Sequence, residues 1–166
     1  TAVILERDSQ SNTAFKILGT KLQTKFSNNI RNNFGFLNAP EDSDPHSPDK
    51  LFIQQGRSVF KEVVPMVQSH IDEHLTGLGI TIEEVRRLWL HQANLSMNQL
   101  IAKRLLGREP KDHEMPIILN DYANTSSAGS IIAFHQTKDD FSSRDIGVIS
   151  SFGAGYSVGS IIVQKI

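Results

Sequence analysis

The sequence predicts a three-layer α/β domain with a mostly parallel sheet, on three observations. Short apolar runs typical of strands alternate with segments whose apolar residues recur every three or four positions, as in helices. At 166 residues the chain has the length of one domain and can bury a substantial core. Apolar runs at Leu88–Leu90, Ile117–Leu119 and Gly147–Ser151 each end in a polar or glycine-rich turn. Because the carboxyl ends of parallel strands meet at one edge of a sheet, we expect a single pocket there.

The first part of the chain is predicted to contain two strands and a loop. Thr1–Glu6 has a continuous apolar run, which favours a buried strand. Phe15–Phe26 alternates apolar and polar residues, which favours a half-buried strand bent at Gly19. Asn38–Lys50 carries three prolines among acidic residues and has little to bury, so we expect a mobile surface loop there.

A long helix is predicted from Gln55 to Leu78, because its apolar residues share one face at a period of 3.6. Pro65 lies inside this helix and predicts a kink or an early break. Gly77 and Gly79 are expected to end it. The apolar stripe consists of Phe60, Val63, Val64, Val67, Ile71, Leu75 and Leu78.

Two capped helices and a strand follow. Thr81 and Glu84 have the spacing of a capping box and predict a short helix. Arg87–Leu90 is expected to be a strand. Asn94 is expected to cap a helix that continues through Leu105 and is closed by the glycine two positions later.

The last part of the chain is predicted to hold three strands and a helix. Ile117–Leu119 is a short apolar run and favours a strand. A helix is expected from Ser126 to about Phe141, with small residues at its start that permit close backbone approach. Ile146–Ser151 and Ser157–Gln164 favour strands, and the short glycine turn between them predicts antiparallel neighbours.

Composition excludes several classes of protein. Hydrophobic residues make up 39% and charged residues 21%, which is ordinary for a globular domain. A formal net charge of −1 creates no global field for nucleic acid or an anionic membrane, and no apolar run approaches the roughly 20 residues of a membrane helix. The absence of cysteine excludes disulfides and thiolate zinc sites and is consistent with a reducing compartment. Thr1–Arg7 lacks an initiator methionine and the order of a signal peptide, so we expect the chain to be part of a longer one.

His70, Glu73 and His74 fit the H-x-x-E-H spacing of a zinc peptidase motif. The predicted helix, however, places His74 within its apolar stripe and His70 at the margin of that stripe. Packed histidines explain the pattern without a metal, and no third ligand stands out in the sequence. We therefore predict no metal site.

The glycine-rich turn after Phe152 has two interpretations. A phosphate-binding loop would lead from a strand into a helix, whereas the residues after this turn favour a strand. A tight hairpin is the simpler interpretation. The functional alternative is a backbone N–H group presented to an oxyanion.

His91 and Asn124 follow predicted strands and are candidate catalytic residues. Each also has a structural explanation, because a lone histidine is commonly hydrogen-bonded structure and an asparagine before a helix is commonly a cap. Together they offer two neutral donors and no nucleophile, which suits stabilisation of an enolate or oxyanion. A serine hydrolase that uses Ser126 or Ser127 is a further alternative, but no Gly-x-Ser-x-Gly elbow occurs in the chain.

Three motifs, in this order, resemble the C-terminal half of bacterial β-ketoacyl-acyl-carrier-protein synthase III, of the thiolase-like superfamily. They are Leu90–Asn94 (LHQAN), Ala123–Ala128 (ANTSSA) and Phe152–Ser160 (FGAGYSVGS), with a weaker match at Gly56–Lys61 (GRSVFK). The likeness covers nearly the whole chain. It implies that residues 1–166 form a C-terminal thiolase-like domain, a three-layer half with a mixed, mostly parallel five-stranded sheet and helices on both faces.

The resemblance implies a Cys–His–Asn triad to which this chain contributes His91 and Asn124. They would hold the thioester carbonyl of malonyl carrier protein while it loses carbon dioxide, and the resulting enolate would attack an acyl-cysteine. The Ala154 N–H would join the oxyanion hole, at a position where the family has glycine, and Phe152 would pack beside the triad. The Cys lies in the N-terminal half of the family, so this chain alone is expected to be inactive.

The resemblance also implies residues that bind substrates. Two departures from the family pattern affect them: Arg57 replaces a common Asn near the CoA entrance, and Ser96 replaces a frequent Arg of the carrier-docking region. The implied set is Asn94, Gly56, Arg57 and Phe60 for CoA and its pantetheine arm, and Lys61, Lys103 and Arg104 for the acidic carrier protein.

The implied function is that of a cytoplasmic acyltransferase of fatty acid or related biosynthesis, which condenses an acyl-CoA primer with malonyl carrier protein. Its partners would be acyl carrier protein and acyl-CoA, and the full-length enzyme would be a homodimer. No cofactor, metal, nucleic acid or membrane would take part. The alternative is a non-catalytic partner subunit or binding domain with the same fold.

Overall fold

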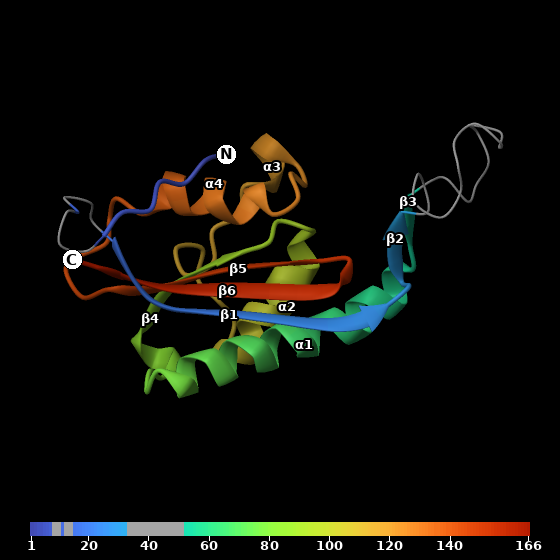
Figure 1. Ribbon diagram of the computed structural model, residues 1–166, viewed down its shortest axis with the longest axis horizontal. Coiled ribbons are helices and arrows are strands. Elements are labelled where there is room, and N and C mark those ends of the chain that lie inside the picture. The colour runs from blue at the N-terminus through green and yellow to red at the C-terminus, as the bar shows by residue number, and fades with distance from the viewer. Residues whose placement is uncertain (8–10, 12–14, 33–51) are drawn as a thin grey trace.

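The computed structural model describes residues 1–7, 11, 15–32 and 52–166, so the loop predicted at Asn38–Lys50 lies outside the described residues. In the described part, a four-stranded sheet has helices on both faces (Figure 1). Its strands are β1 (Phe15–Ser27), β4 (Val85–Leu90), β5 (Ile146–Gly153) and β6 (Gly155–Lys165), and a second small sheet pairs β2 (Ile30–Asn32) with β3 (Phe52–Gln54). The helices are α1 (Gly56–Gly77), α2 (Leu95–Leu106), α3 (Leu119–Tyr122) and α4 (Ala128–Thr137), with a 3₁₀ turn, η4 (Ile82–Glu84).

The main sheet has the order β1–β6–β5–β4, and only β4 and β5 are parallel. A tight hairpin joins β5 to β6, as the sequence predicts, and β1 also pairs antiparallel with β6. The predicted three-layer half is therefore confirmed, whereas five strands and mostly parallel pairing are wrong for the described residues. Parallel neighbours need a long crossover, and β4 is connected to β5 by one, through α2, α3 and α4, whereas a tight hairpin makes β5 and β6 antiparallel.

The predicted strand at Thr1–Glu6 is wrong. Residues 1–7 pair with no strand, and their apolar side chains are exposed, with Ile4 at 92% and Leu5 at 73% of their full accessible surface. A continuous apolar run becomes a buried strand only where other elements cover both of its faces. Within the described ranges no element covers this run.

Ile117–Leu119 is also not a strand. The chain is irregular up to Ile118, and α3 begins at Leu119. Ile118 is buried, but its N–H donates to the side-chain Oε1 of Gln92 at 3.1 Å instead of to a neighbouring strand. The apolar run therefore marks a core contact, and the Ile118 N–H is satisfied by a side chain instead of by a strand partner.

Two hydrophobic cores flank the main sheet. α1 and α2 pack on one face and α4 packs on the other (Figure 1). The first core includes Val63, Val67 and Ile71 of α1, Leu88 and Leu90 of β4, Ile101 of α2, Val148 of β5 and Ile162 of β6. The second consists of Trp89, Ile118, Ala133, Phe141, Ile149 and Val163.

α1 matches its predicted bounds to within one residue at each end. The predicted stripe faces the sheet, except at its end, where Leu78 is 38% exposed. Pro65 does not end the helix, so the predicted early break is wrong. Pro65 lies on the exposed side, where water can satisfy the Lys61 carbonyl that loses its N–H partner. None of the helices in the described ranges is long and apolar enough to cross a membrane.

The predicted caps are confirmed. The Thr81 N–H donates to Glu84 Oε2 at 2.7 Å at the start of η4. Asn94 caps α2, because its Oδ1 accepts from the Met97 N–H at 2.8 Å. Gly107 closes α2 with a φ of 68°, in the left-handed region that favours glycine.

β1 contains an irregularity between Ile17 and Gly19, which confirms the predicted bend. Half-burial is correct for Phe15 but wrong for Leu22 and Phe26, which are 76% and 84% exposed. This end of β1 therefore presents an apolar surface.

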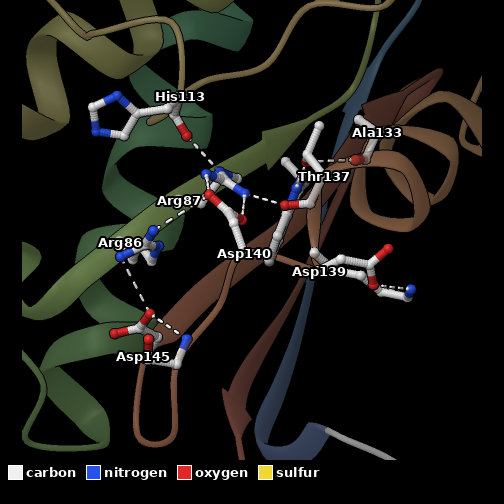
Figure 2. A network of polar contacts seen from close by, with 11 residues as sticks. Arg86, Arg87, His113, Ala133, Thr137, Asp139, Asp140 and Asp145 are labelled. Atoms are coloured by element: carbon white, nitrogen blue, oxygen red, sulfur yellow. Dashed lines mark hydrogen bonds and ion pairs between the residues drawn. The ribbon is translucent and has the colours of Figure 1, made fainter.

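Hydrogen bonds of Arg87 connect the start of β4 to the C-terminal end of α4 (Figure 2). Its Nη1 and Nη2 donate to the two carboxylate oxygens of Asp140 at 2.7 and 2.8 Å, and it also donates to the carbonyls of His113 and Thr137. Hydrogen bonding from Arg87 is the main reason that the pKa of Asp140 lies well below its usual range. α4 ends at Thr137, before the predicted Phe141, and this network anchors that end.

Candidate active site

The site is built where β4 and β5 end. Leu90 lies opposite Ser150, so the chain leaves β4 at His91 beside Ser151 and Phe152 of β5. In Figure 1 this end of β4, the β5–β6 hairpin and α3 lie at the same end of the sheet. The three polar turns therefore gather at one edge of the sheet, although the second turn follows no strand, and the single pocket expected there stays a prediction.

His91 is buried, with 7% of its surface exposed, and its ring lies edge-on to Phe152 with centroids 4.8 Å apart. Its Nδ1 is buried and has no hydrogen-bond partner among the described residues. Burial lowers the pKa of His91 below the ordinary value of 6.5, and an interaction with the Ser126 backbone offsets part of this. The imidazole is therefore neutral at neutral pH, with one nitrogen that can donate to a substrate.

Asn124 lies on an exposed loop between α3 and α4. Its Oδ1 accepts from the Ser126 N–H at 2.9 Å, and its NH₂ group makes no hydrogen bond within the described part of the chain. Ser126 contacts both candidate residues, because its backbone also interacts with His91. The structure thus brings His91 and Asn124 to the same residue. The N-cap position of α4 is Ser127, whose side chain makes no capping hydrogen bond, and not Asn124.

The glycine-rich turn is a tight hairpin between β5 and β6, as the simpler interpretation predicted. Phe152 is buried against His91, whereas Ala154 is exposed at the tip. Gly155 has a φ of 134°, a conformation open to glycine alone. The use of the Ala154 N–H as an oxyanion donor stays a prediction.

The residues implied for CoA and pantetheine belong to the first turns of α1 and α2. Gly56 and Arg57 are exposed at the start of α1, and Phe60 is half-buried against the first core. Asn94 is exposed, with its Oδ1 engaged in the cap of α2 and its NH₂ group directed to no described partner. These positions leave all four accessible from solvent, at least in part.

The residues implied for carrier docking are exposed and lie on two helices. Lys61 is in the second turn of α1 and forms no ion pair with any described residue. Lys103 and Arg104 are in the last turn of α2, and Lys103 pairs with Glu109. A docking carrier would compete with Glu109 for Lys103.

The histidines of the zinc-like motif are structural. His74 Nδ1 lies 2.7 Å from the hydroxyl of Ser160, and His70 Nε2 lies 3.0 Å from the same oxygen. Glu73 points elsewhere and pairs with Lys21 at 2.6 Å. Among the described residues no group of three or more His, Cys, Asp or Glu side chains is arranged to hold a metal ion.

Sequence reasoning missed Gln92, which is completely buried between His91 and the loop that leads to Asn124. A signal was present, because an amide two residues after a continuous apolar strand is expected to be buried and must then find several hydrogen-bond partners. The partners themselves are far away in sequence, so their identity was not readable.

Comparisons with known proteins agree with this architecture. Residues 75–165, more than half of the chain, match the family model described as 3-oxoacyl-[acyl-carrier-protein (ACP)] synthase III C terminal. A beta-ketodecanoyl-[acyl-carrier-protein] synthase of Pseudomonas aeruginosa is 59% identical over 167 residues, which cover 99% of this chain and 48% of that protein. A beta-ketoacyl-[acyl-carrier-protein] synthase III of Lactobacillus helveticus is 34% identical over 125 residues, or 74% of this chain and 37% of that protein.

The fold is similar to that of the 3-oxoacyl-[acyl-carrier-protein] synthase III of Aquifex aeolicus, with a TM-score of 0.75 and 23% identity over 93% of this chain and 46% of that one. The three-layer architecture thus defines a thiolase-like half. The chain belongs to the 3-oxoacyl-[acyl-carrier-protein] synthase III family, a family of transferases, and corresponds to its C-terminal part. It spans less than half the length of the relatives just named.

Proposed function

We propose that the protein containing this chain condenses an acyl-CoA primer with malonyl carrier protein, in fatty acid or related biosynthesis. The observation that supports this most directly is a neutral, buried His91 that shares Ser126 with Asn124, in a chain of the synthase III family. The two side chains offer donors and no negative charge. Such a pair suits an oxygen on which negative charge develops.

The proposed step is decarboxylation of the malonyl thioester. The bond between the carboxylate and the α-carbon breaks, carbon dioxide leaves, and the electron pair moves onto the thioester oxygen as an enolate. His91 and Asn124 donate to that oxygen. The enolate carbon then attacks the carbonyl of an acyl group held as a cysteine thioester, and the cysteine leaves as a thiolate.

The nucleophilic cysteine comes from outside these 166 residues, because the chain contains none. The Ala154 N–H completes the oxyanion hole of the acyl-cysteine, and Phe152 holds the His91 ring. Asn94, Gly56, Arg57 and Phe60 contact CoA and the pantetheine arm. Lys61, Lys103 and Arg104 dock the carrier protein, and the full-length enzyme works as a cytoplasmic homodimer.

The name of the Pseudomonas relative suggests a primer. A beta-ketodecanoyl product has ten carbons, and a condensation that releases carbon dioxide adds two, so that relative's name implies an eight-carbon acyl primer. At 59% identity we extend this medium-chain preference to the full-length protein that contains this chain.

The test uses the full-length enzyme with malonyl carrier protein and either acetyl-CoA or octanoyl-CoA, and mass spectrometry of the carrier-bound product. We expect β-ketodecanoyl carrier protein as the main product. Faster condensation of acetyl-CoA would refute the primer assignment alone. No condensation with any acyl-CoA would refute the enzyme and favour the non-catalytic subunit.

A further inference from the structure

Gln92 makes hydrogen bonds to the backbone of two segments beside the candidate site. It is completely buried, and its Nε2 donates to the Leu90 carbonyl at 2.9 Å and to the Pro116 carbonyl at 3.4 Å. Its Oε1 accepts from the Ile118 N–H at 3.1 Å. Both amide NH₂ hydrogens and the carbonyl oxygen are thus used, all on backbone groups.

These contacts join two separate parts of the site. Leu90 is the last residue of β4 and immediately precedes His91. Pro116 and Ile118 lie just before α3, the short helix from which the chain passes directly into the Asn124 loop. Gln92 therefore connects the backbone that presents His91 to the backbone that presents Asn124.

Gln92 also packs against the start of α4. Gly129 lies so close that a Cβ placed there would stand 2.9 Å from Gln92 Cβ and 3.0 Å from its Cγ. The first turn of α4 can approach Gln92 only because residue 129 has no side chain. The aliphatic part of the Gln92 side chain thus packs against the N-terminal turn of α4, which follows the Asn124 loop in the chain.

The Asn124 loop needs such support because its backbone is strained. Ala123 has a φ of 52° with a ψ of −158°, and Ser126 has a φ of 59°, so residues with side chains adopt the left-handed region on both sides of Asn124. Conformations of this kind persist only where the surroundings hold them in place. Within the loop, the Asn124 side chain supplies one bond, to Ser126.

We propose that Gln92 is a positioning residue, which sets the distance between His91 and the Asn124 loop through its bonds to Leu90, Pro116 and Ile118. The inference rests on the proposed function, in which both side chains must reach one enolate oxygen. Donors to a developing charge must be held within a fraction of an ångström, so loosening this connection should affect decarboxylation more than acyl loading.

Three variants of the full-length enzyme test this role. Gln92→Met keeps the length of the side chain and removes all three hydrogen bonds. Gln92→Glu keeps an acceptor for the Ile118 N–H but sets a carboxylate against the carbonyls of Leu90 and Pro116. Gln99→Met is the matched control, because Gln99 is exposed on α2 and makes none of these contacts.

Two activities are measured for each variant: acyl transfer from acyl-CoA to the enzyme, and decarboxylation of malonyl carrier protein. We expect Gln92→Met to lose roughly 10- to 100-fold in decarboxylation and less than about threefold in acyl loading. Gln99→Met should match the wild type in both. Hydrogen exchange of the peptide that contains Ile118 should become faster in Gln92→Met and stay unchanged in Gln99→Met.

Gln92→Glu provides a readout that a general loss of packing does not move. Burial raises the pKa of the introduced carboxyl, and its protonated form regains one O–H donor, which can bond one of the two carbonyls. The decarboxylation rate of Gln92→Glu relative to the wild type should therefore rise as the pH falls from about 8 to about 6. The same ratio for Gln92→Met should be independent of pH.

Equal losses of loading and decarboxylation in Gln92→Met, or a flat pH ratio for Gln92→Glu, would overturn the positioning role. So would decarboxylation by Gln92→Met at the rate of Gln99→Met. A wild-type enzyme that neither loads nor decarboxylates would instead overturn the proposed function. In that case the faster hydrogen exchange of the Ile118 peptide in Gln92→Met than in Gln99→Met would persist, which separates failure of the proposed function from failure of the positioning role.

Discussion

Removing the Asn124 side chain should separate the two half-reactions of the full-length enzyme. Asn124 has two roles in the structure: its Oδ1 accepts from the Ser126 N–H at 2.9 Å, and its NH₂ group is free to donate to a substrate. Loss of an oxyanion donor costs roughly 10²–10³ in rate, or about 2.7–4 kcal/mol. The bond to Ser126 contributes about 1 kcal/mol to the loop and is present before and after the reaction. Asn124→Ala should therefore lose about 10²–10³ in malonyl decarboxylation while still loading acyl groups.

Asn124→Asp decides between a catalytic donor and a local cap. An aspartate keeps the acceptor for the Ser126 N–H, so a residue that serves only as a cap should tolerate it. As a donor site it should be at least as poor as alanine, because a carboxylate repels the enolate and supplies no N–H.

The assay follows carbon dioxide release from malonyl carrier protein beside acyl-enzyme formation in each variant. Wild-type decarboxylation by Asn124→Ala, or near-wild-type activity of Asn124→Asp with a defective Asn124→Ala, would refute the pairing of Asn124 with His91.

Three further predictions follow from the sequence and the structure. The 166-residue chain alone, incubated with radiolabelled acyl-CoA, should stay unlabelled because it contains no cysteine, and a stable thioester adduct would contradict this. Changing Lys103 and Arg104 to Glu in the full-length enzyme should raise the KM for the carrier protein and hardly change the KM for acyl-CoA. The difference between the two KM effects should become smaller as the salt concentration rises, and equal effects on both KM values would refute the docking assignment. Burial is the main cause, and the positive charge of Lys21 the second, that lowers the pKa values of His70 and His74 below 6.5. As the pH drops through about 6.5, these histidines therefore bind protons in the unfolded chain before they do so in the folded one, and the free energy of unfolding should fall. Denaturant titrations should show a weaker pH dependence after both are changed to Gln, and an undiminished pH dependence would contradict this assignment.

Local chemistry made much of this fold predictable. The 3.6-residue stripe of α1, the Asn94 cap of α2, and the Thr81–Glu84 capping box all depend on residues within a few positions of one another. The hairpin after Phe152 is likewise a short-range feature. For the same reason the sequence by itself placed His91 directly after a buried strand, and its motifs indicated the family to which the chain belongs.

The tertiary structure decided which apolar runs became strands and how the site is held. Thr1–Glu6 and Ile117–Leu119 have the composition of strands, but a strand forms only where a neighbouring backbone offers matching donors and acceptors. Ile118 gives its N–H to Gln92 instead, across 26 positions of the chain. The contact between His91 and Phe152 and the meeting of His91 and Asn124 at Ser126 also join distant segments. Such pairings depend on the three-dimensional packing of α4 against β4 and β5, which no local pattern encodes.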